Sequence, residues 1–391
     1  MKSFSAQYIF TNTGAPLIRG IITTDDDGTI IGIEDTGGDL KERSSVQFYN
    51  GIIIPGFVNC HCHLELSHMK GSIAKGKGLG DFIKEIRNNR NNIDTKILSA
   101  ARSADNEMYQ EGIVLCADVC NNPITFDIKK ESRIRYLNLL EVFGIDPEKA
   151  DKRMDELAKL AQAAEKLDLP FYVVPHSVYS LSLPLFRLLR KKSEINAITS
   201  IHFMETAGEK QFLENRSGEL MVSYIESGLI TSGLQIIDSH IDAVLKEITS
   251  SGNLILVHNT FADRDTIKVI RKRGNIFWCL CPNSNIYIEN QIPPVDLLLE
   301  EGCDLVIGTD SLASNTRLSI LEEMKTLQKN LPSVGLEEMI LWATLNGARA
   351  LNEVSSFGSI ENGKRPGLLL LQNVDLISMK LQPDSFVTRL I

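Results

Sequence analysis

Short apolar runs alternate with amphipathic segments through most of this chain of 391 residues. From Pro55 onward, the segments between the runs carry apolar residues every three or four positions, as in DPEKADKRMDELAKLAQAAEKL. Strands and helices are therefore expected to alternate, which predicts β/α units around a parallel sheet. The strand candidates, eight in all, are GIIIPGFVNCH, GIVLCADV, RYLNLLEVF, PFYVVPHS, ITSIHFME, NLILVHNT, NIFWCLCP and CDLVIGTD.

Eight such units in roughly 300 residues predict a closed (β/α)8 TIM barrel rather than an open doubly wound sheet. No Gly-x-Gly-x-x-Gly turn follows the first run. The N-terminal segment instead holds short strand candidates separated by turns, and strand-like residues return after the predicted helix LEEMILWATLNGARAL. The predicted fold is α/β, with residues 55–355 forming the barrel and residues 1–54 and 356–391 forming a small β-sandwich domain built from both chain ends.

The charge balance indicates what kind of partner the chain has. Lysine and arginine total 41 against 50 acidic residues, a net charge of -9, which argues against general affinity for nucleic acid or anionic membranes. No basic and apolar leader opens the chain, and no apolar run is long enough to span a bilayer. We therefore expect a cytoplasmic protein whose partner is a small-molecule substrate, with no nucleic acid and no membrane.

Seven cysteines make a disulfide framework improbable, since the number is odd and most of them lie inside strand-like runs. Cys60 and Cys62 form one C-x-C pair, and Cys279 and Cys281 form another. Zinc sites usually space two cysteines by two to four residues. We therefore expect buried, reduced thiols at Cys60 and Cys62 rather than metal ligands.

Histidines gather at the ends of the predicted strands. Because the carboxyl ends of barrel strands meet on one face, these side chains are expected to converge there. Random placement would rarely produce this pattern, so a functional site is favoured over isolated core or loop histidines. His68 and His240 lie away from strand ends, and a surface or loop position is predicted for both. The strand-end histidines are five of the seven: His61, His63, His176, His202 and His258.

His61 and His63 are separated by one residue, so both side chains project from the same face of a strand. His202 offers a third nitrogen, and Asp310 offers a carboxylate at the end of the eighth run. Three imidazoles and a carboxylate suit one divalent transition metal, zinc first, with iron or manganese as alternatives. Such an ion lowers the pKa of bound water from 15.7 to about 7, so the pattern predicts a metal-dependent hydrolase.

Glu205 follows His202 by three residues, at a point where the chain turns. A carboxyl group there can approach a bound heterocycle, protonate a ring nitrogen and then carry a proton to the leaving group. The alternative interpretation is a carboxylate that only stabilises the start of the next helix.

The motifs resemble those of the amidohydrolase superfamily, in its aminohydrolase or deaminase branch, over nearly the whole chain. The segment PHSVYSLS is similar to one in deaminases of S-adenosylhomocysteine, methylthioadenosine or aminofutalosine. GKRPGLLLL departs from the family, which usually carries an aspartate there. The motifs that carry the resemblance are PGFVNCHCH, HFMET, LVHN, CPNSN, GTDSLASN, ATLNGARAL and GSIENGK.

This resemblance implies that His61, His63, His202 and Asp310 hold the metal, with Asp310 also accepting a proton from the attacking water. His258 would polarise that water or the developing oxyanion, and in some relatives it is counted among the ligands. The segment FYVVPHS lacks a lysine that could be carboxylated, so one metal ion is expected.

For the substrate, the resemblance implies that His176 contacts the nucleoside and that Glu205 contacts its base. Asp81 in GLGDFI would bind the ribose hydroxyls. Members of the family commonly form homodimers, and no organic cofactor is needed.

The expected activity is hydrolytic deamination of a 6-aminopurine nucleoside of the aminofutalosine, S-adenosylhomocysteine, methylthioadenosine or adenosine type, releasing ammonia. This is hydrolysis of a carbon–nitrogen bond, other than a peptide bond, in a cyclic amidine. Alternatives on the same scaffold are another aminated heterocycle such as a guanine or pterin, a chlorinated triazine, or a cyclic amide. A catalytically silent scaffold is a third hypothesis. The sequence does not predict the group attached to the ribose, because barrel loops recognise that group and no general code relates loop sequence to ligand.

Overall fold

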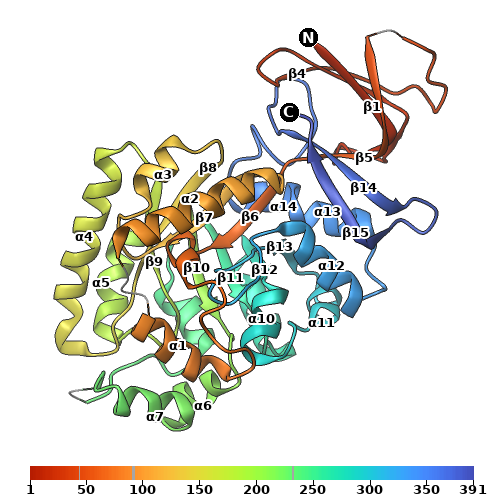
Figure 1. The fold of residues 1–391 in the computed structure, drawn as a ribbon. Coiled ribbons are helices and arrows are strands. Elements are labelled where there is room, and N and C mark those ends of the chain that lie inside the picture. The colour runs from red at the N-terminus through yellow and green to blue at the C-terminus, as the bar shows by residue number, and fades with distance from the viewer. Residues whose placement is uncertain (44, 90–92, 231–232) are drawn as a thin grey trace.

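The structure is a computed structural model, which describes residues 1–391 except 44, 90–92 and 231–232. Strands in the middle of the molecule are surrounded by helices, and a separate sheet lies to one side, where both termini are found (Figure 1). The predicted fold class, a barrel beside a small β domain made from both chain ends, is confirmed by this arrangement. The domain boundaries at residues 54 and 355 stay a prediction.

The barrel consists of two parallel sheets, each with four strands among the described residues, in the orders β6-β7-β8-β9 and β10-β11-β12-β13. They close into one barrel where Cys62 bridges Asp310 and where Ser177 bridges His202. Every strand end on the carboxyl side therefore faces one shared space. The strands are β6 (Phe57–Cys62), β7 (Ile113–Cys120), β8 (Arg135–Val142), β9 (Phe171–Pro175), β10 (Ile198–Phe203), β11 (Asn253–His258), β12 (Ile276–Leu280) and β13 (Asp304–Ile307).

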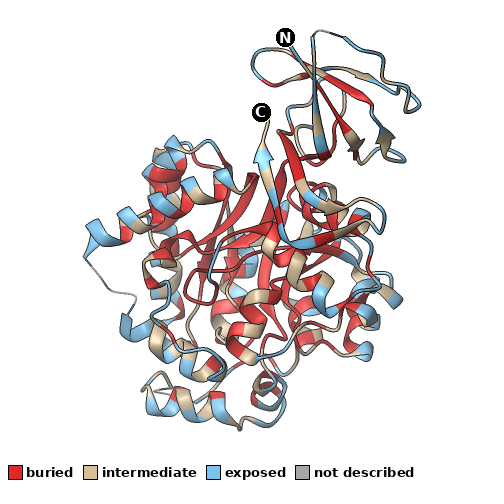
Figure 2. Ribbon diagram, turned by 45° about the vertical axis from the view of Figure 1, so that its right-hand side comes forward, coloured by how far each residue is buried: buried red, intermediate tan, exposed pale blue. Residues whose placement is uncertain are grey.

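Helices follow the strands and cover the outside of the barrel, and their ribbons carry both buried and exposed residues, whereas the strands inside are mostly buried (Figure 2). In the described part of the chain, none of them is both long and apolar enough to cross a membrane. The helices are η1 (Leu64–Met69), α1 (Gly78–Asn89), α2 (Asp94–Gln110), α3 (Phe126–Glu131), η2 (Pro147–Lys149), α4 (Ala150–Lys166), α5 (Leu183–Ser193), α6 (Gly208–Asn215), α7 (Glu219–Glu226), α8 (His240–Asp242), η3 (Ala243–Glu247), α9 (Arg264–Ile270), η4 (Arg271–Arg273), α10 (Pro282–Glu289), α11 (Val295–Glu300), α12 (Ile320–Asn330), α13 (Leu336–Ala343) and α14 (Leu345–Ala350).

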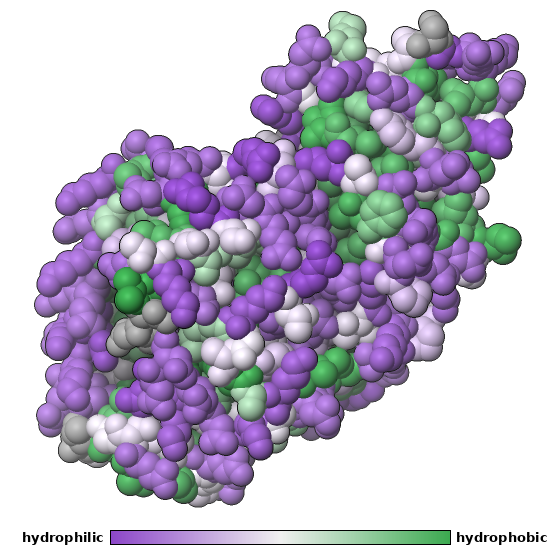
Figure 3. Space-filling view, in the orientation of Figure 1, coloured by the Kyte–Doolittle hydropathy of each residue, from purple (hydrophilic) through white to green (hydrophobic). Residues whose placement is uncertain are grey.

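The two chain ends meet in one sheet of order β15-β14-β5-β1-β3-β4, with β2 paired to β1. β14 runs antiparallel to β5, so a C-terminal strand completes the N-terminal sheet. Phe4, Ile22, Ile53 and Leu370 belong to a separate buried cluster here. On the face seen in Figure 3, hydrophobic residues gather over this sheet, while the barrel side is mostly hydrophilic. The strands are β1 (Lys2–Ile9), β2 (Leu17–Ile18), β3 (Ile21–Thr24), β4 (Ile30–Glu34), β5 (Val46–Pro55), β14 (Leu368–Asp375) and β15 (Lys380–Arg389).

The first predicted barrel strand, GIIIPGFVNCH, is divided between two sheets. Its first half ends β5 in the chain-end sheet, and its second half forms β6 in the barrel. Gly56 lies between them, where a Cβ atom would come within 2.3 Å of a Val114 methyl and 2.7 Å of the Pro366 carbonyl oxygen. Glycine at this position lets the chain pass from one sheet to the other in a space too small for a side chain.

The predicted helix LEEMILWATLNGARAL is broken into α13 and α14. Thr344 at the break has φ -135° and ψ -83°, outside the helical region. Its hydroxyl donates to the Ile340 carbonyl at 2.5 Å and accepts from the Asn12 side chain at 2.8 Å. These contacts tie the break to the N-terminal segment, a long-range interaction that helical periodicity does not report.

Candidate active site

His61 and His63 lie at the end of β6, and their Nε2 atoms are 3.2 Å apart. Both side chains are buried, with 0% and 6% of their surface exposed. Two imidazole nitrogens this close can share one ion at about 2.0–2.1 Å from each. The structure therefore brings together the pair predicted from the H-x-H spacing.

His202 joins them from the end of β10. Its Nδ1 lies 2.8 Å from the His176 carbonyl oxygen. Because a carbonyl can only accept, Nδ1 carries the proton and Nε2 keeps a lone pair that can bind a metal. The candidate ligand atoms of His61, His63 and His202 lie within 4.8 Å of one another.

Asp310 follows β13 and completes this cluster. Its Oδ1 is 3.6 Å from the Nε2 atoms of both His61 and His63. Its Oδ2 accepts hydrogen bonds from the hydroxyls of Ser284 at 2.5 Å and Ser314 at 2.6 Å. One carboxylate oxygen is thus held by the protein, and the other faces the histidines.

The charges of this cluster suit a divalent cation. Burial and the neighbouring His61 lower the pKa of His63, and burial lowers the pKa of His202 well below its usual range. Burial would raise the pKa of Asp310, but a hydrogen bond with His61 and the nearby His63 bring it well below the usual range. At neutral pH the imidazoles of His63 and His202 are therefore neutral and the Asp310 carboxylate is charged, as metal binding requires. Within the described residues, the buried Nδ1 of His61 also has no hydrogen-bond partner.

His258 ends β11 and faces the same space. The Asn285 amide nitrogen lies 3.2 Å from its Nδ1 and 2.7 Å from the Thr260 hydroxyl. An NH2 group can only donate, so Nδ1 accepts and Nε2 carries the proton of the neutral ring. Burial lowers the pKa of His258 to about 3, so the ring is neutral near pH 7. Its Nε2, 3.6 Å from a Glu205 oxygen, is a buried donor without a hydrogen-bond partner in the described part of the chain.

Backbone strain marks three of the strand ends. Met204, His258 and Asp310 have φ values of 48°, 76° and 55°, in the left-handed region that few side chains tolerate. Such conformations cost about 1–3 kcal/mol each and persist where surrounding contacts hold them, often at functional sites. They turn the chain sharply where β10, β11 and β13 deliver side chains to the site.

Glu205 lies on the turn after β10 and is 5% exposed. Its Oε2 accepts a hydrogen bond from the Tyr179 hydroxyl at 3.1 Å. Burial and the nearby Glu209 carboxylate raise the pKa of Glu205 well above its usual range, so it can carry a proton at neutral pH. A protonated carboxyl group beside a metal-binding cluster is a candidate general acid.

His176 lies after β9, beside His202, with ring centroids 4.4 Å apart. Its Nδ1 is 2.7 Å from a Glu141 oxygen, and the other Glu141 oxygen accepts from the Asn121 amide at 2.6 Å. Burial would raise the pKa of Glu141, but the neighbouring His176 lowers it to about 2. A charged carboxylate therefore orients the His176 ring.

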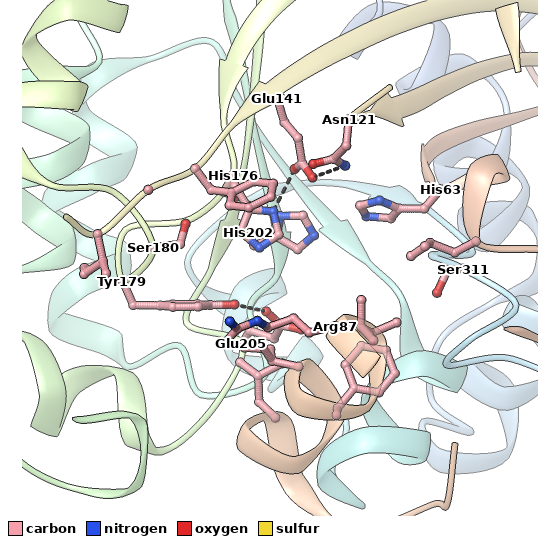
Figure 4. A pocket seen from close by; sticks show the side chains of 18 of the residues that line it. His63, Arg87, Asn121, Glu141, His176, Tyr179, Ser180, His202, Glu205 and Ser311 are labelled. Carbon is pink, nitrogen blue, oxygen red and sulfur yellow. Dashed lines mark hydrogen bonds and ion pairs between the residues drawn. The ribbon is translucent and has the colours of Figure 1, made fainter. Parts of the chain in front are cut away.

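A cavity of about 470 Å³ joins these groups. Figure 4 shows His63, His202 and His176 on one part of its wall and Glu205 with Tyr179 on another. His258 and Asp310 also line it. Another part of the wall is apolar and includes Leu66, Phe82, Ile83, Ile86 and Leu229.

Asp81 is not brought to the cavity. It lies on the exposed side of α1, whereas Leu79, Phe82, Ile83 and Ile86 of the same helix line the cavity. Residues three and four apart share a helix face. None of these cavity-lining residues is three or four positions from Asp81, so Asp81 lies on a different face. The structure gives no support to Asp81 as a ribose-binding residue.

The cysteine prediction is confirmed. Cys60 and Cys62 are free thiols with 0% exposure, and Cys279 and Cys281 are free and buried as well. Burial raises the pKa of the Cys60 thiol well above its usual range, which favours the neutral form over a metal-binding thiolate.

Sequence reasoning missed several residues around the site. Glu141 shows the same pattern that identified the histidines, because it is a polar residue near the end of the apolar run RYLNLLEVF. Tyr179 and Asn285 lie in loops or short helices after strands and show no comparable pattern. The surface or loop prediction for His240 is wrong, because this side chain is 6% exposed and its Nε2 lies 2.7 Å from a Glu209 oxygen. His68 lies in the short helix η1.

Comparison with known proteins agrees with the barrel fold. An adenosine deaminase of Helicobacter pylori is 28% identical over 334 residues, covering 82% of this chain and 79% of that protein. The crystal structure of H. pylori aminofutalosine deaminase with methylthio-coformycin has a TM-score of 0.80 at 24% identity, covering 95% of this chain and 92% of the other. A structure of an adenosine deaminase from Xanthomonas campestris with bound zinc has a TM-score of 0.71 at 20% identity, covering 97% and 86%. The resemblance to the deaminase branch is thus confirmed. Residues 52–387 match the model of the amidohydrolase family, and the chain belongs to this family.

Proposed function

We propose that this protein is a metal-dependent hydrolase that removes the amino group of a 6-aminopurine nucleoside and releases ammonia. One observation carries the proposal. Glu205, whose raised pKa favours its protonated form, lines the same cavity as the His63, His202 and Asp310 side chains. A proton donor and a cation-binding cluster on one small cavity are what hydrolysis of a ring amine requires. The H. pylori relative named adenosine deaminase supports the same chemistry.

The donor set fits a divalent metal ion. We assign His61, His63, His202 and Asp310 as its ligands, with zinc as the first choice because the X. campestris neighbour contains zinc. When bound, the ion supplies a Lewis acid that activates water at neutral pH. His258 is assigned a different role, because its Nε2 carries a proton and so cannot offer a lone pair.

Side chains of the protein then accept and donate the protons. The charged Asp310 carboxylate accepts a proton from the attacking water. Glu205 donates its proton to the ring nitrogen beside the amino-bearing carbon, then takes up the proton of the hydroxyl added to that carbon and delivers it to the amino group, which departs as ammonia. Asp310 finally releases the proton that it accepted, and Glu205 takes one up again. The His258 Nε2–H donates a hydrogen bond to the oxygen that gains negative charge during attack. Burial of all three side chains excludes water and strengthens these interactions.

His176 is proposed to contact the nucleoside, since it lines the cavity beside His202 and is oriented by Glu141. The apolar wall would receive the ribose and its substituent. Formation of a homodimer stays a prediction.

The test is ammonia release from adenosine, methylthioadenosine, S-adenosylhomocysteine, aminofutalosine and guanine by zinc-loaded protein, with metal-free protein and Glu205→Gln as controls. We expect turnover of at least one adenine nucleoside, lost in both controls. No ammonia from any adenine nucleoside, with one metal ion bound per chain, would reject the proposal.

A further inference from the structure

A buried histidine and carboxylate pair lies directly behind Glu205. Glu209 is completely buried, and its Oε1 accepts the backbone N–H of Glu205 at 2.5 Å and that of Thr206 at 3.0 Å. Its other oxygen, Oε2, is 2.7 Å from Nε2 of His240. Both oxygens of Glu209 therefore have partners, and two of these partners are backbone groups of the turn that carries Glu205.

The pair joins two segments that are distant in sequence. Glu209 lies in the first turn of α6, and His240 begins α8, 31 residues later. The His240 ring also packs edge-on against Phe203, the last residue of β10, with centroids 5.0 Å apart. Neither Glu209 nor His240 lines the cavity. They can therefore act on the substrate only through the residues that they hold.

The turn that carries Glu205 depends on such contacts. Met204, immediately before Glu205, has the strained φ of 48°, so the turn needs surrounding interactions to keep its shape. Glu209 fixes the backbone of Glu205 from one side, while the Tyr179 hydroxyl fixes its carboxyl group from the other. Proton transfer requires hydrogen-bond contact of about 2.6–3.2 Å, so a shift of 1 Å in this turn would weaken it greatly.

We propose that Glu209 and His240 are positioning residues that hold Glu205 at the geometry needed to transfer its proton to the substrate. This inference rests on the proposed function of Glu205. His240 keeps Glu209 in place, and Glu209 keeps the turn in place.

The charges around Glu205 agree with this arrangement. The groups that face it are Tyr179 after β9, Glu209 on α6, His258 on β11, Asp310 after β13 and Glu289 on α10. After burial, the Glu209 carboxylate is the largest cause of the raised pKa of Glu205. The same residue that fixes the backbone thus also favours the protonated carboxyl group.

Paired substitutions separate hydrogen bonding from charge and from simple packing. His240→Gln keeps an N–H near Nε2, whereas His240→Leu fills the space without a donor. Glu209→Gln keeps an oxygen for the two backbone N–H groups, whereas Glu209→Ala removes it. Glu214→Gln, an exposed carboxylate on the same helix α6, is the matched control.

We expect His240→Leu and Glu209→Ala to lower kcat about 10–100-fold, as loss of an outer contact to a catalytic group typically does, with KM within about threefold of wild type. His240→Gln should restore most of kcat, and Glu214→Gln should leave it unchanged. Metal content, measured in every variant, should stay at the wild-type value. Equal loss in His240→Gln and His240→Leu, or a loss confined to KM, would overturn the inference.

A crystal structure of His240→Leu gives a readout that needs no substrate. We expect the turn at residues 204–206 to move and the hydrogen bond between Tyr179 and Glu205 to be lost. If the turn and this bond are unchanged, the inference is wrong even when the wild-type protein is an active deaminase. If the wild-type protein deaminates nothing, the proposed function fails, while the crystal structure still decides whether the pair holds Glu205.

Discussion

Two walls of one cavity are built from different kinds of element. The wall with His63, His202, His258 and Asp310 comes from the carboxyl ends of barrel strands, and each of these side chains is at most 6% exposed. Another part of the wall, with Phe82, Ile83 and Ile86, comes from helix α1, and these three side chains are only half-buried.

The difference shows how this fold separates chemistry from recognition. Strand ends are fixed by backbone hydrogen bonds to both neighbours and by a packed barrel core, so they can hold reacting groups within fractions of an ångström. Helices and loops outside the barrel have fewer such constraints and can vary without disturbing those groups. Substitutions on the strand-end wall should therefore change kcat, and substitutions on the α1 wall should change KM.

The largest effect is expected from Asp310→Asn. The substitution keeps the shape of the side chain but removes the charge that faces His61 and His63 and the capacity to take a proton. We expect kcat to fall by about 10⁴-fold or more, with weaker metal binding, measured by ammonia release and elemental analysis. Asp304→Asn, at the exposed start of the same strand β13, is the control and should retain full activity. If Asp310→Asn retained more than a tenth of wild-type kcat, the reaction would not depend on the strand-end wall.

A smaller loss is expected from Glu205→Gln. Glutamine can accept the Tyr179 hydrogen bond but has no acidic proton to give, so kcat should fall about 10²–10⁴-fold while the bound metal is retained. The wild-type enzyme should also lose kcat as pH rises through the raised pKa of Glu205, because the acid form is the active one. A variant with normal kcat and an unchanged pH profile would remove Glu205 from the mechanism.

The strand-end wall could be predicted from the sequence to a large extent. His61, His63, His202 and Asp310 each follow a short apolar run, and parallel strands bring such positions to one barrel face. Period-two and period-3.6 patterns, which identify strands and helices, were sufficient to predict the barrel itself.

What could not be predicted depends on contacts between distant segments. Asp81 was predicted to bind the ribose hydroxyls, and its exposed position on α1 follows from the rotation of this helix about its axis, which packing against its neighbours sets. His240 was expected at the surface, because its partner Glu209 is 31 residues away and no local pattern links them. The break at Thr344 likewise depends on Asn12. Local periodicity contains no information on these partners.

The α1 wall should respond differently from the strand ends. Ile83→Ala removes apolar surface from the cavity, and for a half-buried isoleucine this costs about 1 kcal/mol of binding to an apolar substituent. We expect KM to rise about fivefold for methylthioadenosine, with kcat within twofold of wild type and little change for adenosine. Lys84→Ala, an exposed neighbour on α1, is the matched control. An equal fall of kcat for both substrates would contradict the separation of the two walls.

The smallest effect on activity, but a clear one on stability, is expected from Glu323→Gln behind the strand-end wall. Glu323 on α12 is completely buried and accepts hydrogen bonds from the side chains of Asn283 at 3.0 Å and Asn315 at 2.7 Å. It therefore ties the start of α10, which carries Ser284, to the loop that carries Ser314. Burial raises its pKa to about 8.

Because the folded state binds this proton more tightly than the unfolded chain, its stabilising contribution is complete below about pH 4.5 and is lost as pH rises through about 8. In the wild-type protein, the free energy of unfolding should therefore decline by on the order of a few kcal/mol between pH 5 and 8. Glutamine does not titrate, so this decline should be absent from the variant. Urea unfolding at both pH values measures this, with Glu322→Gln on the same helix as control. A wild-type pH dependence in Glu323→Gln would mean that the strand-end wall is supported without a protonated carboxyl group. The rigidity that distinguishes the strand-end wall from the α1 wall would then come from the barrel core alone.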